Sequence, residues 1–116
     1  MFTPIGAENF NSEVLAEDKP VLLAFISPNY EYKEQTTVLA GVSKKYDRKL
    51  KVYLLDEDAI GICMKFGVEG FPAFIIFEGG EEKGRMLGKA NKETLSSFVQ
   101  KTLPDIKGSH KNNFTF

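Results

Sequence analysis

Cys63 is the only cysteine among the 116 residues and the first residue to consider for chemistry. A single thiol forms no internal disulfide and no cysteine-based metal cluster. It can exchange with the disulfide of another molecule when its thiolate is populated and accessible. The thiol shares one face of a predicted helix with Ala59, Ile62 and Phe66, and a free cysteine on such an apolar stripe packs as a small hydrophobe. The pattern favours a core role, and thiol exchange through Cys63 is the alternative.

The other polar residues indicate no second chemical site. His110 has no further metal ligand at a useful spacing, so we expect a solvated imidazole. Residues 56–58 are all acidic, but they open a predicted helix, where acids interact favourably with the helix dipole. Gly79-Gly80 is typical of a turn, and neither a phosphate-binding glycine loop nor a serine–histidine arrangement stands out. We therefore expect no metal, no cofactor and no catalytic residue of these classes.

Charge and hydropathy exclude several kinds of partner. Lys and Arg number 15 against 16 Asp and Glu, a net charge of -1, whereas domains built for nucleic acid or anionic membranes carry a basic excess. No apolar run approaches the ~20 residues of a membrane-spanning helix. The first ten residues contain no basic residue and no long apolar block, so no secretory signal is predicted and a cytoplasmic location is expected. The sequence leaves the oligomeric state open.

Three continuous apolar runs predict strands that are buried on both faces. They span residues 21–26, 50–55 and 73–77. The first lies between Lys19-Pro20 and the turn-prone Ser27-Pro28-Asn29, which favours a short strand over a helix. Strands without polar alternation are typical of a sheet that helices cover on both sides.

Helical patterns alternate with these strands. Apolar faces predict a short helix near residues 12–16, a second carrying Val38, Leu39, Val42 and Tyr46, a third ended by Gly67, and a last one capped by Asn91 and stopped by Pro104. The loop 78–81 predicts a hairpin between the third strand and a shorter one at 83–87. The order predicts an α/β domain over residues 1–104, with a central mixed sheet flanked by helices on both faces, and a loose polar tail over 105–116.

This order and several segments resemble the thioredoxin family. The matching segments are Lys19–Leu23 with Phe25, Lys49–Val52, and Lys65–Phe77 followed by Gly80. The resemblance covers about residues 8–103 and implies the thioredoxin fold, with Pro72 at the position of the family's cis-proline. It also implies that the loop before the predicted second helix holds the redox motif.

The motif itself departs from the family pattern. Tyr30 occupies the first cysteine position of Cys-x-x-Cys, and Tyr32 or Lys33 occupies the second. Ala24 and Leu54 stand where the family has a buried acid and its lysine partner, two charges that are costly to bury singly. Compared with the residues that the resemblance implies at these positions, the changes predict a redox-inactive, thioredoxin-like member of the family. Such a member has no dithiol–disulfide oxidoreductase activity.

The main functional prediction is therefore a non-catalytic module that binds a protein or an extended peptide segment. In the family the backbone before the cis-proline pairs with an extended client segment, and tyrosines suit recognition surfaces. The predicted groove residues are Tyr30, Glu31, Tyr32, Phe71, Pro72 and Gly88. The alternative is a monothiol thiol–disulfide oxidoreductase acting through Cys63, with glutathione or a client as the exchange partner. A third possibility is a structural subunit that associates through a sheet edge.

Overall fold

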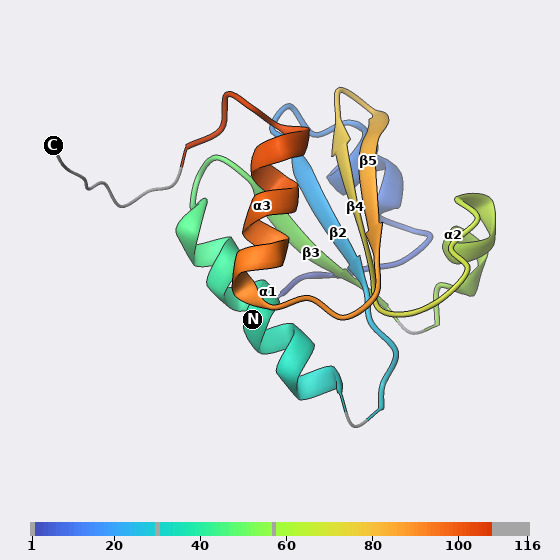
Figure 1. The fold of residues 1–116 in the computed structure, drawn as a ribbon. Helices are drawn as coiled ribbons and strands as arrows, with labels where there is room; N and C mark the ends of the chain where they lie inside the picture. The colour runs from blue at the N-terminus through green and yellow to red at the C-terminus, as the bar shows by residue number, and fades with distance from the viewer. Residues whose placement is uncertain (1, 30, 57, 108–116) are drawn as a thin grey trace, which may run out of the picture.

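A computed structural model describes residues 2–29, 31–56 and 58–107 (Figure 1). The elements, in chain order, are β1 (Pro4–Ile5), the single-turn π-helix η1 (Asn11–Leu15), β2 (Val21–Phe25), α1 (Tyr32–Lys45), β3 (Lys51–Leu55), α2 (Ile60–Lys65), β4 (Ala73–Glu78), β5 (Glu81–Leu87) and α3 (Lys92–Thr102). The division into a domain of residues 1–104 and a loose tail stays a prediction, because 108–116, including His110, lie outside the described residues.

The sheet has five strands in the order β1-β3-β2-β4-β5. β2 runs parallel to β3 and antiparallel to β4, and β4 and β5 form a hairpin. Gly79 and Gly80 turn this hairpin with φ angles of 63° and 81°, values that glycine adopts without steric cost. The prediction of an α/β fold with a mixed sheet is confirmed.

Helices cover both faces of the sheet (Figure 1). All five residues of β2 are buried, and they divide between two core clusters, Val21, Leu23 and Phe25 on one face and Leu22 and Ala24 on the other. The first cluster includes side chains of η1 and α2, and the second includes side chains of α1 and α3. Burial of each large apolar side chain here contributes roughly 1.5–3 kcal/mol to the stability of the fold. Because β2 contributes side chains to both clusters, it lies at the centre of the core.

The largest differences from the predictions are the presence of β1 and the starts of α1 and β5. β1 was not predicted, because it has only two residues and one of them is Pro4. α1 begins at Tyr32, earlier than its apolar stripe indicates, because its first turns are polar and largely exposed. β5 begins at Glu81, two residues before the predicted start, since its charged side chains face solvent on an edge strand.

The predicted helix ends are confirmed at α2 and α3. Gly67 follows α2 with a φ of 62°, the left-handed conformation expected of a terminating glycine. Asn91 caps α3, and its side chain accepts the Thr94 N–H at 2.8 Å while the Asn91 N–H donates to Thr94 Oγ1 at 3.0 Å. This reciprocal capping box satisfies donors that the helix leaves unpaired.

Tyr53 links β3 to η1 by a hydrogen bond and makes the stability of the fold depend on pH in the alkaline range. Its hydroxyl donates to Glu13 Oε1 at 2.9 Å, and its side chain is only 7 % exposed. Burial, with a smaller contribution from Glu13, raises the pKa of Tyr53 to about 12. The unfolded chain releases this proton near pH 10, whereas the folded chain keeps it to higher pH. Stability therefore falls as pH rises between these values.

Tyr53→Phe removes this dependence. We expect wild type to lose about 2–3 kcal/mol of unfolding free energy between pH 9 and 12 from this group. The variant loses about 1 kcal/mol at pH 8 through the missing hydrogen bond and then declines less steeply. Urea unfolding at a series of pH values measures both effects. Parallel declines for the two proteins would contradict the assignment.

Candidate functional site

The one thiol lies on α2, against the first core cluster. Cys63 is 6 % exposed and packs in the cluster that also contains Phe10, Phe77 and Ala73. Its backbone carbonyl accepts the N–H of Val68 at 2.9 Å. The predicted core placement of Cys63 is confirmed.

Burial also sets the acidity of this thiol. Desolvation raises the pKa of Cys63 above its ordinary value, and a backbone hydrogen bond offsets only part of that effect. Thiolate is therefore scarce at neutral pH while α2 stays in place. Reaction of Cys63 with a disulfide requires that α2 move away from the core.

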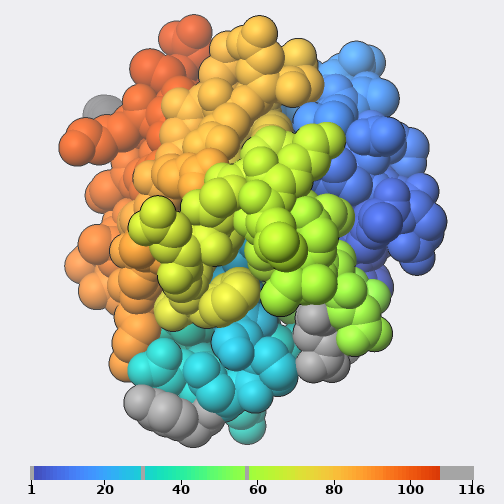
Figure 2. Space-filling view, turned by 90° about the vertical axis from the view of Figure 1, so that its right-hand side faces the viewer, coloured from blue at the N-terminus to red at the C-terminus, as the bar shows by residue number. Residues whose placement is uncertain are grey.

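The outer face of α2 is apolar and exposed. Ile60 is 65 % exposed and Met64 is 76 % exposed, on either side of Cys63 in the helix. Figure 2 shows α2 and the loop that follows it on one face of the molecule, above the segment that leads into α1. Exposed apolar side chains beside a thiol offer contact surface to the molecule that carries the second sulfur.

The Phe71–Pro72 peptide bond is cis, and the loop that contains it lies next to the end of β5. The Gly88 N–H donates to the Pro72 carbonyl at 2.8 Å. Gly88 has a φ of 106°, which favours glycine. Phe71 projects outward and is 48 % exposed. The structure thus brings Pro72 and Gly88 together, and their role in a peptide groove stays a prediction.

Ionic and amide contacts join the loop between β5 and α3 to the start of α1. Lys89 Nζ lies 3.5 Å from Glu31 Oε2 and 3.6 Å from Glu34 Oε1, and the two carboxylates raise the pKa of the Lys89 ammonium. The fully buried Gln35 amide pairs with the backbone of Ala90, donating from Nε2 to its carbonyl at 3.1 Å and accepting its N–H at 3.0 Å. Sequence reasoning missed Gln35, because nothing local distinguishes it from a surface residue of α1.

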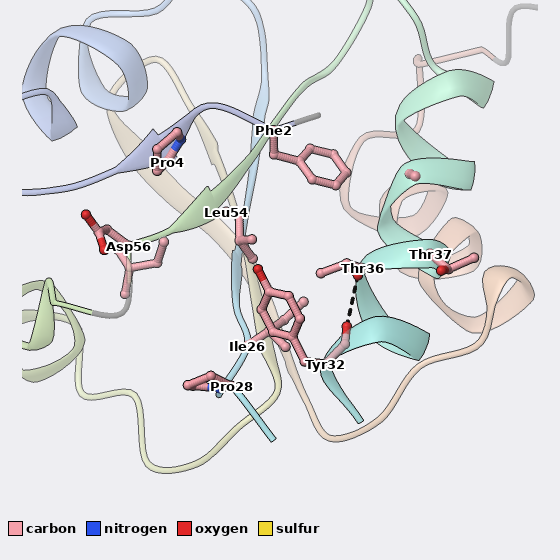
Figure 3. Close-up of a pocket in the computed structure, with 11 residues that line it drawn as sticks. Phe2, Pro4, Ile26, Pro28, Tyr32, Thr36, Thr37, Leu54 and Asp56 are labelled. Atoms are coloured by element: carbon pink, nitrogen blue, oxygen red, sulfur yellow. Dashed lines mark hydrogen bonds between the residues drawn. The ribbon is translucent and has the colours of Figure 1, made fainter. Parts of the chain in front are cut away.

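Tyr32 faces a different part of the surface. It lines a pocket of about 620 Å³ together with Phe2, Ile26 and Leu54, and Phe71 is not among the lining residues. In Figure 3 the Tyr32 ring points toward Leu54, while its backbone carbonyl accepts the Thr36 hydroxyl at 2.9 Å. Tyr30 lies outside the described residues. A common binding role for the six groove residues stays a prediction.

The described residues form neither a metal-binding cluster nor a membrane-spanning helix. Within residues 2–29, 31–56 and 58–107, no group of three or more His, Cys, Asp or Glu side chains is placed to hold a metal ion. Over the same ranges, no helix is long and apolar enough to cross a membrane.

The fold defines the class of protein. A five-stranded mixed sheet in the order β1-β3-β2-β4-β5 with helices on both faces makes a thioredoxin-like α/β domain. The sequence profile of the Thioredoxin family matches residues 2–101. The chain belongs to the thioredoxin family.

Relatives from several organisms are similar over most of the chain. Thioredoxin 1 of Nostoc sp. is 30 % identical over 96 residues, which are 81 % of this chain and 90 % of that protein. The thioredoxin of Synechocystis sp. is 30 % identical over 101 residues, 85 % of this chain and 94 % of that protein. The chloroplastic M-type thioredoxin of Spinacia oleracea is 32 % identical over 101 residues, but this chain spans only 56 % of its length.

These comparisons contradict the prediction of a non-catalytic binding module. The relatives are named thioredoxins, and thioredoxins are thiol–disulfide oxidoreductases. The single cysteine gives no support to the non-catalytic interpretation, because one thiolate is enough to attack a disulfide. The replaced motif removes both thiols of a dithiol mechanism, and Cys63 on α2 leaves exchange through one thiol open. The findings favour the alternative prediction, in which Cys63 acts as a monothiol.

Proposed function

We propose that this chain is a monothiol thiol–disulfide oxidoreductase that acts through Cys63. The observation that carries the proposal is the presence of one thiol, on the short helix α2, in a chain of the thioredoxin family. The family's Cys-x-x-Cys motif has no counterpart in this sequence. The reaction therefore uses a second thiol from another molecule instead of a second cysteine of the chain.

Cys63 takes part in two successive thiol–disulfide exchanges, and a further small thiol then completes the reaction. The Cys63 thiolate attacks one sulfur of a client disulfide, so that a bond from Cys63 to that sulfur forms and the client S–S bond breaks. The leaving thiolate takes a proton from solvent. A small-molecule thiol such as glutathione then attacks the mixed disulfide, restores the Cys63 thiol and is itself left in a disulfide with the client sulfur. A further small thiol completes the reduction of the client.

Opening of α2 gives the client access to the thiol. The helix has six residues, and a helix that short is stable only through its packing. Local opening exposes little surface and costs less than global unfolding. Once released into water, Cys63 loses the desolvation that raises its pKa, so that exposure and thiolate formation occur together.

The partner in this proposal is a protein or an extended peptide that carries a disulfide. Ile60 and Met64 supply apolar contacts around the exchanged sulfur, since both are exposed on α2. A reducing compartment such as the cytoplasm suits a protein that works with a free thiol, and we propose that location.

A trapping experiment tests the proposal. The native protein is incubated with glutathione disulfide at pH 8 and analysed as the intact chain by mass spectrometry. We expect one glutathionyl adduct on wild type and none on Cys63→Ala. A matched series in increasing urea separates native reactivity from unfolding. An adduct that forms only at urea concentrations that unfold the protein would contradict the proposal.

A further inference from the structure

Arg85 of β5 reaches across to the end of α2. Its Nη2 donates to the Phe66 carbonyl at 2.7 Å, and its Nη1 donates to the Gly67 carbonyl at 3.4 Å. Phe66 is the C-cap of α2 and Gly67 follows it, and carbonyls at the C-terminal end of a helix have no partner within the helix. A guanidinium at this position satisfies them and interacts favourably with the negative end of the helix dipole.

Glu82 holds the guanidinium in this orientation. Arg85 Nε lies 2.6 Å from Glu82 Oε2, and Arg85 Nη2 donates to Glu82 Oε1 at 2.7 Å. Paired contacts to both carboxylate oxygens fix the plane of the guanidinium. The hydrogen bond from Arg85 also holds the pKa of Glu82 below its ordinary value, so the pair stays ionised near neutral pH.

A hollow lies between the loop after α2 and the edge strand at this point. It has a volume of about 270 Å³ and is lined by Val68 and Glu69 of the loop and by Ile75, Arg85 and Leu87 of the sheet. Apolar packing between the loop and β5 is therefore incomplete at this point, and two hydrogen bonds of Arg85 connect β5 to Phe66 and Gly67. The same segment, from Cys63 to Gly67, must move when the thiol is exposed.

We propose that Arg85, oriented by Glu82, is a latch that controls how often α2 opens and exposes Cys63. This inference rests on the proposed function for its biological meaning, but the latch itself is a property of the fold. Arg85 is a positioning residue and touches neither the thiol nor a reacting sulfur. Opening of α2 breaks its two contacts with the helix end, so removal of Arg85 makes the open state more populated.

The test is the rate at which iodoacetamide alkylates Cys63 in the folded protein. We expect about tenfold faster alkylation in Arg85→Met, the size expected for losing charge-assisted hydrogen bonds at a partly exposed site. Glu82→Gln retains the guanidinium but loses its ionic anchor, so its rate lies between those of wild type and Arg85→Met. Lys83→Met is the matched control, because Lys83 lies on the same strand and pairs only with Glu81 at 3.3 Å among the described residues.

A second readout separates the latch from general stability. Alkylation through local opening is almost independent of urea at low concentrations, whereas alkylation through global unfolding rises steeply with urea. The latch predicts that Cys63 in Arg85→Met is alkylated faster than in wild type and that this rate hardly changes at low urea concentrations. The proposal is overturned if Arg85→Met and Lys83→Met match wild type within twofold, or if the acceleration appears only in the urea-dependent part.

The two proposals can fail separately. Faster alkylation of Arg85→Met supports the latch whether or not glutathione disulfide reacts. If alkylation is accelerated while no mixed disulfide forms on any variant, the latch stands and the oxidoreductase proposal is wrong. If wild type forms the mixed disulfide and Arg85→Met is alkylated no faster than wild type, the latch is wrong and the oxidoreductase proposal stands.

Discussion

Replacing Gln35 with alanine will lower the unfolding free energy by about 3–4 kcal/mol, the largest effect we expect from any single polar residue of this chain. The Gln35 amide is fully buried and makes both of its hydrogen bonds to Ala90. The variant leaves the N–H and the carbonyl of Ala90 without partners in a site that excludes water. Leaving each buried group unpaired costs roughly 1–3 kcal/mol, and the cavity adds to that.

Urea unfolding followed by circular dichroism measures this loss. Thr37→Ala is the matched control on the same helix, because the Thr37 hydroxyl is exposed and donates only to the carbonyl of Lys33. We expect the control to stay within about 0.5 kcal/mol of wild type. A Gln35→Ala variant as stable as Thr37→Ala would show that water replaces the amide and that the contact does not fix the loop before α3.

Phe66→Ala will both destabilise the protein by about 3 kcal/mol and accelerate alkylation of Cys63 in the folded state by roughly a hundredfold. The Phe66 ring lies 5.4 Å from the ring of Phe10 and 5.4 Å from that of Phe77, in tilted and edge-on arrangements. Phe66 directly follows α2. Its removal takes away the apolar anchor that returns the helix to the core.

Phe98→Ala is the control for this prediction. Phe98 lies on α3, is partly buried and packs against the core cluster on the opposite face of the sheet. The control lowers the unfolding free energy but leaves alkylation in the absence of urea close to that of wild type. Equal acceleration by Phe66→Ala and Phe98→Ala would mean that Cys63 reacts only through global unfolding.

Much of the fold can be predicted from the sequence because its determinants are local. β2 and β4 are short, continuous apolar runs, and such strands belong in a sheet covered on both faces. Gly67 and Asn91 mark helix ends through conformations and capping bonds that involve only neighbouring residues. β1 could not be predicted, because two residues are too few to show a hydropathy pattern. Its position depends on pairing with β3.

The candidate site depends on contacts between distant parts of the chain, and those cannot be predicted in this way. Gln35 and Ala90 are 55 residues apart, and Arg85 and Phe66 are 19 apart. Gln35 and Arg85 look like ordinary surface residues until the sheet brings their partners near. The burial of Cys63 could be predicted, because its helical neighbours are apolar. Its functional interpretation required the comparisons, because a missing motif indicates which chemistry is lost but not which remains.

The most direct test of thiol exchange at Cys63 is a measurement of catalytic turnover. A protein disulfide is reduced by glutathione in the presence of a small amount of wild type, Cys63→Ala or no protein, and the new thiols are counted over time. Thiol exchange through Cys63 predicts that wild type raises the rate above the reaction without protein and that Cys63→Ala does not. A wild-type rate equal to the uncatalysed rate, or an undiminished rate in Cys63→Ala, would contradict the assignment of thiol exchange to Cys63.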